Sequence, residues 1–173
     1  MGKNIDEALE RKESHMNKNL VAYFSASGTT ARVAKKLADA IGADLFEIVP
    51  QQPYTSADLN WQDRTSRTTA EKNDRSLRPA IAGQVSHMEA YDTVFLGVPI
   101  WWYGAPNIIN TFLESYDFKG KTIVPFATSG GSAMGRTNDA LAPSCPGAKL
   151  CEGRRFASNA GAGELKAWAE TFC

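Results

Sequence analysis

Four hydroxyl side chains surround a glycine in one six-residue stretch, which contains no charged side chain. The stretch consists of Ser25, Ala26, Ser27, Gly28, Thr29 and Thr30. It follows an apolar run and precedes an amphipathic one, so we expect it to join a buried strand directly to a helix. The first turn of a helix carries unpaired amides and about half a positive charge, and glycine allows close approach of the backbone. We interpret the stretch as a loop that binds a terminal phosphate.

Residues that this stretch lacks exclude two classes of phosphate-binding loop. A triphosphate-binding loop would need a Lys in the pattern G-x-x-x-x-G-K-[ST], and a phosphatase loop would need a Cys and a nearby Arg. Neither set is present, which favours a monophosphate held by backbone dipoles and hydroxyls. The alternative is that Ser27 or Thr29 only caps the helix, although a single residue would be enough for that.

Two further segments carry groups suited to a planar ring. The first, within 97–107, contains Pro99, Ile100, Trp101, Trp102, Tyr103 and Gly104; the second, within 127–136, contains Thr128, Ser129, Gly130, Gly131 and Ser132. Aromatic side chains between rigid turn residues predict a stacking platform, and amides and hydroxyls suit the polar edge of a ring. Alternatively, one of Trp101 and Trp102 packs beneath its loop, and the second segment is a flexible turn. The sequence does not decide which Trp stacks.

The surrounding pattern predicts how these segments are positioned. Strands are expected at 19–25, 43–49, 92–98, 121–127 and 148–157, the last with a break at Gly153; helices are expected at 29–42, 105–115 and 163–172. This alternation indicates an α/β fold with a parallel sheet covered by helices on both faces. Ligands bind at the carboxyl ends of such strands, where all three segments fall. Residues 50–90 are polar, with weak helical periodicity near 57–73.

Composition bounds the class of protein. The chain has 173 residues, enough for one compact domain, with 19 basic and 19 acidic side chains and 43% hydrophobic residues. This balance argues against a nucleic-acid partner, and no apolar run approaches the roughly 18–20 residues that cross a membrane. Three cysteines, an odd number without metal-binding spacing, favour the reducing cytoplasm. We expect residues 1–15 to be an expression leader and 16–173 to be the domain.

A monophosphate at one end and a ring with a polar edge at the other describe a mononucleotide such as flavin mononucleotide (FMN). The segments 25–30, 98–104 and 128–131 resemble the flavodoxin-like superfamily, in a subgroup with a Pro-Ile-Trp-Trp ring-binding loop, and 66–79 resembles the same subgroup. The resemblance implies a doubly wound five-stranded sheet in the order 2-1-3-4-5, with non-covalent FMN at the strand ends. It also implies a possible homodimer. Tyr54 and Trp61 are candidates for covering the second ring face, and Trp61 suits a core position equally well.

Two functions remain open. One is an oxidoreductase that passes electrons from NAD(P)H through FMN to a quinone or similar acceptor; the other is an electron carrier that docks to a redox-partner protein. The ring-binding segments contain no Asp or Glu, which favours the oxidoreductase, whereas no nicotinamide-binding motif is evident. A phosphorelay receiver would need an acidic cluster that the early loops lack. His87 is expected on the surface, Cys145 in a loop without a catalytic role, and Arg154 and Arg155 at a solvated edge.

Overall fold

The computed structural model describes residues 18–101, 104–128 and 134–172. The predicted leader lies outside these ranges, as do Trp102, Tyr103, Ser129, Gly130, Gly131 and Ser132 of the predicted site. The described strands are β1 (Asn19–Tyr23), β2 (Asp44–Glu47), β3 (Val49–Pro50), β4 (Ile81–Ala82), β5 (Thr93–Pro99), β6 (Thr122–Thr128), β7 (Lys149–Leu150) and β8 (Arg154–Phe156). The helices are α2 (Thr29–Ile41), α3 (Arg67–Asn73), α4 (Asn107–Glu114), α5 (Thr137–Leu141), α6 (Ala162–Glu170) and the short 3₁₀ turns η1 (Met88–Ala90) and η2 (Ala142–Ser144).

The central sheet has the predicted topology. Its strands run in the order β2-β1-β5-β6-β7, with β8 also paired to β6, and all of these pairings are parallel. The order 2-1-3-4-5 is confirmed once β7 and β8 are counted as the two halves of the fifth strand. The break between β7 and β8 includes Gly153, as predicted. A Cβ at this position would lie 2.6 Å from the carbonyl oxygen of Pro125, so the close approach of the two backbones requires glycine there.

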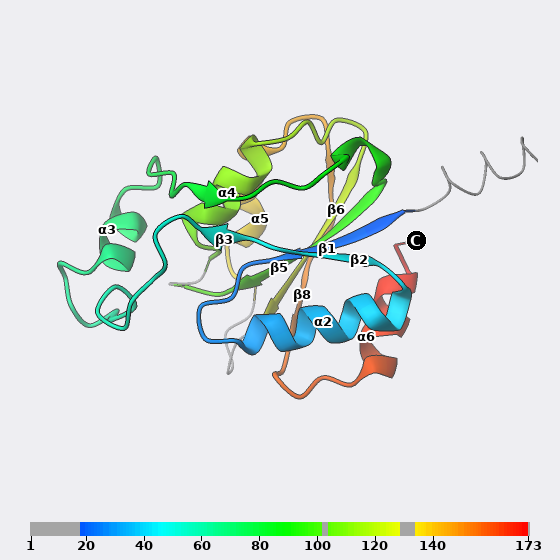
Figure 1. Cartoon of the computed structure of the whole chain (residues 1–173), viewed down its shortest axis with the longest axis horizontal. Coiled ribbons are helices and arrows are strands. Elements are labelled where there is room, and N and C mark those ends of the chain that lie inside the picture. The colour runs from blue at the N-terminus through cyan, green and yellow to red at the C-terminus, as the bar shows by residue number, and fades with distance from the viewer. Residues whose placement is uncertain (1–17, 102–103, 129–133, 173) are drawn as a thin grey trace, which may run out of the picture.

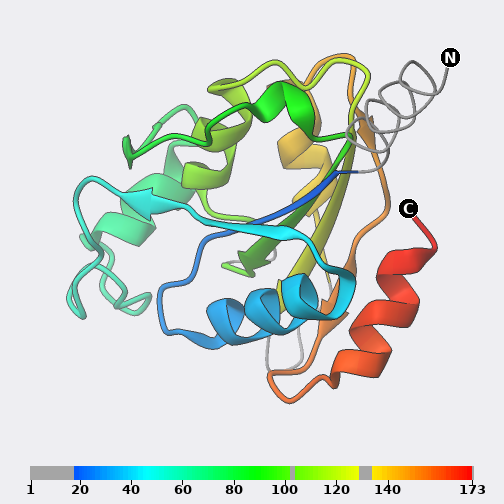
Figure 2. The same cartoon turned by 45° about the vertical axis from the view of Figure 1, so that its right-hand side comes forward.

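Helices cover both faces of this sheet. On one face, α2 and α6 lie side by side, and the stripe of Val33 and Leu37 packs with Leu165 of α6 in one apolar cluster. On the other face, α4 packs against the sheet through Ile108 and Phe112, with α5 beside it (Figures 1 and 2). Hydrophobic burial on both faces therefore stabilises the sheet. The ends of its strands are covered by loops and not by these helices.

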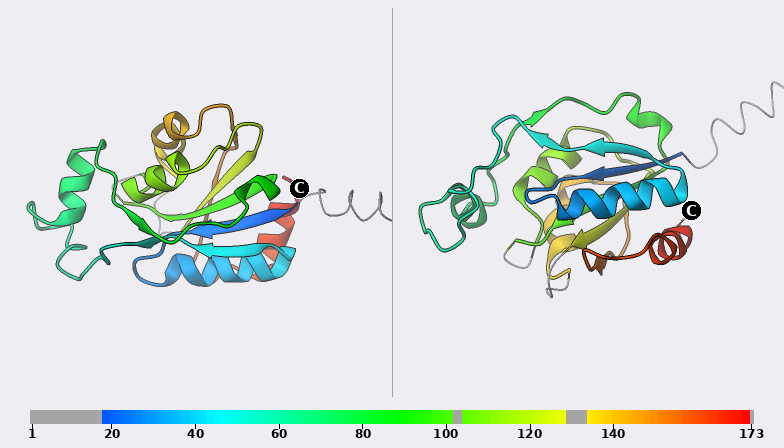
Figure 3. Two further views of the ribbon diagram at one scale, coloured as in Figure 1. Left: turned by 45° about the horizontal axis from the view of Figure 1, so that its top comes forward. Right: turned by 60° about the horizontal axis from the view of Figure 1, so that its bottom comes forward.

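The region between β2 and β5 is where the sequence pattern was least informative. It forms an antiparallel pair, β3 with β4, and the helix α3, which lies beyond the end of the sheet where β1 and β5 finish (Figure 3). The expected helical segment at 57–73 is helical only over Arg67–Asn73. Trp61 is 67% exposed, so a core position for it was wrong. The helix α5 was not predicted.

Two expected boundaries also shift. Pro106 is the N-cap of α4 and precedes its first turn. The strand expected at 43–49 is divided: β2 covers Asp44–Glu47 at the edge of the central sheet, and Val49 belongs to β3, which pairs with β4 instead. None of the helices in the described ranges is long and apolar enough to cross a membrane.

Candidate functional site

The loop between β1 and α2 leaves the first turn of the helix open to a ligand. Gly28 is the N-cap of α2 and has a φ of 91°, the left-handed region that glycine favours. No side chain caps the helix, so the interpretation of this stretch as a simple cap was wrong. The Gly28 amide donates instead to the Ser25 hydroxyl at 3.0 Å, which closes the loop on itself. The first-turn amides that follow are the unpaired donors that an anion needs.

A hydroxyl pair joins this loop to the end of β6. The side-chain oxygens of Thr30 and Thr128 lie 2.7 Å apart, and both residues are buried. Only one hydrogen can lie between two hydroxyls, so the other hydroxyl keeps its hydrogen for a third group. The pair therefore both fixes the two loops to each other and retains one donor for a ligand.

These loops line a cavity of about 440 Å³. Of the predicted site residues, it brings together Ala26, Ser27, Thr29, Thr30, Pro99 and Thr128. They come from the ends of β1, β5 and β6, which the parallel sheet places along one edge. Ser27 and Thr29 are exposed or half-buried, and their hydroxyl oxygens are 3.4 Å apart. The donor set is hydroxyls and amides, which fits a phosphate.

The cavity also contains a cation that the sequence analysis missed. Arg155 and Ser158 line it, although Arg155 was expected at a solvated edge and no Arg was expected near the phosphate loop. The cause is the register of the last strand: Ala127 pairs with Arg155, and Thr128 pairs with Phe156, which is buried against α2 and α6. Because side chains alternate along a strand, burial of Phe156 on one face turns Arg155 away from that core. Arg155 follows Thr30 by 125 residues in the sequence, so no local pattern indicated that both residues line one cavity.

Trp101 packs against the core where the aromatic segment begins. Its backbone exchanges two hydrogen bonds with Gly104, at 2.8 and 3.2 Å, which closes the loop at its base. Its indole is half-buried and packs edge-on against Phe24 and Tyr54, with ring centroids 5.6 and 5.5 Å away. Trp101 thus packs against the core, whereas Trp102 lies outside the described residues, so which of the two stacks on a ring stays a prediction. Ile100 packs against the same core.

Tyr54 holds this cluster to α3. Its hydroxyl donates to Glu71, with the two carboxylate oxygens 2.7 and 3.0 Å away, and burial and this bond raise the pKa of Tyr54. The Arg67 guanidinium lies 3.8 Å above its ring and also donates to Glu71 at 3.2 Å. One face of Tyr54 is thus already covered by a cation. The Tyr54 side chain therefore connects α3 to Trp101, through its hydroxyl at one end and its ring at the other.

The remaining candidates take no part in the site. His87 is exposed and paired with Glu89 at 3.0 Å, so the surface prediction is confirmed. Cys145 is buried, which raises the pKa of its thiol and leaves it unreactive at neutral pH. The described residues contain no group of three His, Cys, Asp or Glu side chains that could hold a metal ion.

Comparisons with known proteins agree with this geometry. Two crystal structures of candidate flavoproteins are similar to the chain: that from Bacteroides eggerthii is 51% identical, with a TM-score of 0.84, and covers 89% of this chain and 96% of its own. The structure from Bacteroides uniformis is 46% identical, with a TM-score of 0.83, and the match covers 89% of this chain and 98% of that one.

A more distant match is a flavoprotein from Lactobacillus acidophilus that was solved in complex with FMN. It is 20% identical, with a TM-score of 0.68, and the match covers 88% of this chain and 99% of that one. No curated protein matches. The family model described as flavodoxin matches residues 18–172. With the phosphate-type loop at the end of β1 and a parallel sheet in the order expected for such proteins, the chain belongs to the flavodoxin family.

Proposed function

We propose that this chain binds FMN and is an oxidoreductase that transfers electrons from NAD(P)H to a quinone or similar acceptor. The observation that carries the proposal is the uncapped first turn of α2, which opens into a cavity lined by hydroxyls and Arg155. Membership of the flavodoxin family supports it, and a chain of the same fold from Lactobacillus acidophilus was solved with FMN.

The residues of the chain have separate tasks in this proposal. The amides of Thr29 and Thr30, with neighbouring hydroxyls and Arg155, hold the phosphate. The loop from Pro99 to Gly104 and the segment from Thr128 to Ser132 hold the ring. Trp101 fixes the first of these loops through Phe24 and Tyr54, which leaves Trp102 as the residue proposed to contact the ring.

FMN, when bound by these residues, would supply the redox chemistry that connects the nicotinamide donor to the acceptor. The balanced reaction is NAD(P)H + H⁺ + quinone → NAD(P)⁺ + hydroquinone. The choice of an oxidoreductase depends on charge: the segments 97–107 and 127–136 contain no carboxylate, and Arg136 ends the second. A carboxylate about 4 Å from the ring would oppose full reduction by around 4 kcal/mol at an effective dielectric near 20.

The test is a reduction experiment on the purified protein loaded with FMN. NADH or NADPH is added with menadione as the acceptor, and oxidation of the nicotinamide is followed by absorbance. We expect turnover that depends on both the protein and FMN. An electron carrier would give flavin that binds tightly but is not reduced by either nicotinamide, and that result would replace the oxidoreductase with the carrier. Failure to bind FMN would refute both.

A further inference from the structure

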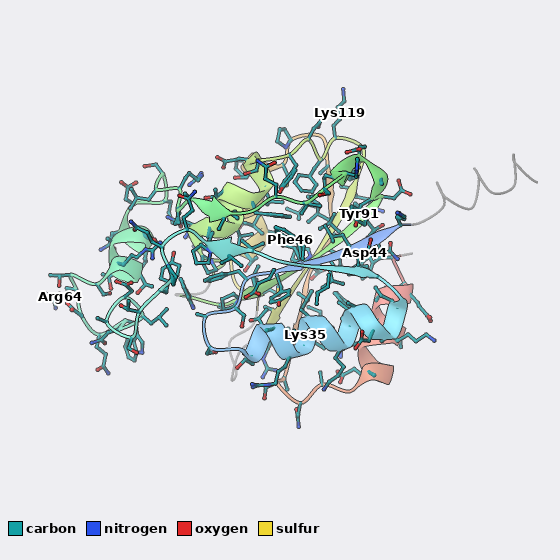
Figure 4. All side chains as sticks on the ribbon, viewed as in Figure 1. Lys35, Asp44, Phe46, Arg64, Tyr91 and Lys119 are labelled. Atoms are coloured by element: carbon teal, nitrogen blue, oxygen red, sulfur yellow. The ribbon has the colours of Figure 1, made fainter. Side chains whose placement is uncertain are left out.

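The chain between the short strands β3 and β4 forms a separate unit, residues 51–80, which we call the α3 unit. It leaves and rejoins the rest of the domain at one place, where the amide of Gln51 donates to the carbonyl oxygen of Ala80 at 2.9 Å. The unit lies beyond the end of the sheet (Figures 1 and 3), and Arg64 marks its tip, farthest from the sheet (Figure 4). Because ligands bind at that end of a parallel sheet, the contacts of the α3 unit bear on the site.

Polar bonds, and not an apolar core, hold the α3 unit together. Among residues 51–80, all of which the structure describes, no hydrophobic residue is buried, and the buried ones are Ser66, Thr68 and Glu71. The Thr68 hydroxyl, for example, donates to the carbonyl oxygen of Asp58 at 2.8 Å. Since the unit buries little apolar area, its position depends on the specific contacts that it makes with the rest of the domain.

Three of these contacts converge on the segment that runs from the ring-binding loop into α4. The ring of Tyr54 packs edge-on against the indole of Trp101, with centroids 5.5 Å apart. The Arg75 guanidinium donates to the carbonyl oxygen of Ala105 at 3.1 Å. The Asn107 side chain donates to two carbonyl oxygens at the end of α3, at 2.9 and 3.1 Å. The α3 unit thus contacts the start, the middle and the end of this segment.

The contacts cross an open interface. A cavity of about 520 Å³ is lined by Thr68 and Glu71 of the α3 unit and by Trp101, Ala105 and Asn107 of the facing segment. Side chains that line a cavity have no packing partner across it. The few bonds that bridge the two walls therefore fix the distance between them.

Tyr54 is held at both of its ends. Its hydroxyl donates to the buried carboxylate of Glu71 at 2.7 Å. Its ring contacts Phe24 as well as Trp101, and the centroid of Phe24 is 5.7 Å away. Glu71 also accepts from Arg67 at 3.2 Å, so the carboxylate is fixed from two sides. The orientation of the Tyr54 ring against Trp101 is therefore set by α3.

We propose that the α3 unit positions the ring-binding loop, with Tyr54 and Arg75 as its positioning residues. Tyr54 acts through Trp101, whose backbone closes that loop with Gly104, and Arg75 acts through the backbone at Ala105. The α3 unit then controls the affinity for the flavin ring and leaves the affinity for the phosphate to the cavity at α2. The inference rests on the FMN-binding part of the proposed function and is independent of which acceptor is reduced.

Titration of the flavin-free protein with FMN and with riboflavin tests this proposal. Tyr54→Leu should weaken both ligands by the same factor, about 2- to 10-fold, which is the size of one aromatic pair. Arg75→Gln should also weaken both equally, by about 2- to 5-fold, which is the size of one hydrogen bond.

Two control substitutions alter the same unit or its attachment away from the loop. Glu114→Gln weakens the ion pair that joins Arg78 of the unit to the other end of α4 at 3.0 Å. Arg64→Gln changes an exposed side chain at the tip of the unit (Figure 4). We expect both controls to bind FMN and riboflavin as the wild type does.

A double-mutant cycle shows whether Tyr54 acts through Trp101. In a Trp101→Leu background, Tyr54→Leu should weaken riboflavin by less than about twofold, because the contact through which it acts is already gone. The full effect of Tyr54→Leu in that background would overturn the assignment.

Two measurements separate positioning from a loss of stability. The first is visible circular dichroism of the bound flavin at saturating FMN, where a variant that is only less stable would recover the wild-type spectrum; we expect Tyr54→Leu to keep an altered one. The second is hydrogen exchange of the flavin-free protein. The amides of Trp101 and Gly104, which donate to each other's carbonyl oxygens, should exchange faster in Tyr54→Leu, whereas the amides of α2 should not.

The outcomes distinguish this inference from the proposed function. A wild type that binds neither flavin would refute the proposed function, and exchange at Trp101 and Gly104 would still decide whether the α3 unit holds the loop. A wild type that binds FMN, with variants that match the controls in affinity, spectrum and exchange, would overturn the inference alone. So would a loss of affinity for FMN with riboflavin unchanged, because the unit would then act on the phosphate.

Discussion

Replacing Arg155 by Gln tests whether the cavity at α2 recognises a phosphate. The substitution removes a positive charge and keeps a shorter polar side chain that still has hydrogen-bond donors. FMN and riboflavin differ only in the phosphate, so the comparison between them isolates its contribution. We expect the variant to lose affinity for FMN and to bind riboflavin as the wild type does.

The size of the effect follows from the dimensions of the cavity. A volume of about 440 Å³ corresponds to a sphere with a radius of about 5 Å, so a phosphate at its centre lies ~5 Å from the lining groups. At an effective dielectric near 20, a pair of unit charges at that distance is worth ~3 kcal/mol. Arg155 is half-buried, and solvent screening reduces this value, which leaves about 1–2 kcal/mol, or a 5- to 30-fold change in Kd.

The assay is quenching of flavin fluorescence in titrations of the flavin-free protein. Each ligand is titrated into the wild type, into Arg155→Gln and into Arg154→Gln. Arg154 is a matched control, because it is the neighbouring arginine and its guanidinium is paired with Glu164 at 2.9 Å on the surface. An equal loss for FMN and riboflavin in Arg155→Gln, or the same loss in the control, would refute an electrostatic role for Arg155.

Three further predictions concern the framework. Gly28→Val should abolish tight FMN binding. Gly120→Val is its control, because Gly120 has a φ of 80° with open space around it, and the substitution imposes the same left-handed strain. Both variants should lose at least ~1–2 kcal/mol of stability, but Gly120→Val should leave FMN titrations unchanged. Asn107→Ala should destabilise the protein by about 1–3 kcal/mol and speed hydrogen exchange in α3; Asn110→Ala, on the same helix with a similar pair of bonds, should leave that exchange unaltered. Tyr91, which donates to a β2 carboxylate at 2.6 Å, has its pKa raised to about 12, so the unfolded chain loses this proton first and the free energy of unfolding should fall between about pH 10 and 12. Chemical denaturation should show a smaller fall in Tyr91→Phe than in the wild type, because Tyr23 and Tyr54, whose pKa values are also raised, still contribute to it; a pH profile identical to that of the wild type would contradict the assignment.

The sequence pattern was sufficient for the sheet because its signals are local. Continuous apolar runs predict buried parallel strands, and the hydroxyl-rich turn before α2 predicts an anion site from six adjacent residues. The strand order is confirmed. Gly28 has the left-handed conformation at an uncapped helix start, which is compatible with an anion site, but the site itself stays a prediction. The break of the last strand at Gly153 was also readable, since glycine interrupts a strand.

The groups that the pattern missed depend on contacts between distant residues. Arg155 lines the cavity beside α2 because of the register of β8 against β6. The alternation of side chains along a short strand does not by itself show which of its faces is buried. Trp61 is apolar and large, yet it lies on an exposed loop. The short helix α3 has little helical signal in the sequence, and Asn107 at the start of α4 holds its end in place. Tertiary packing decides each of these cases.

The most direct test of the central claim is nuclear magnetic resonance of the Thr29 and Thr30 amides. If the first turn of α2 holds the phosphate, both amide resonances should move strongly on addition of FMN and in the same direction on addition of inorganic phosphate, while riboflavin should leave them nearly in place. FMN that binds tightly without moving these two resonances would contradict the claim that α2 holds the phosphate.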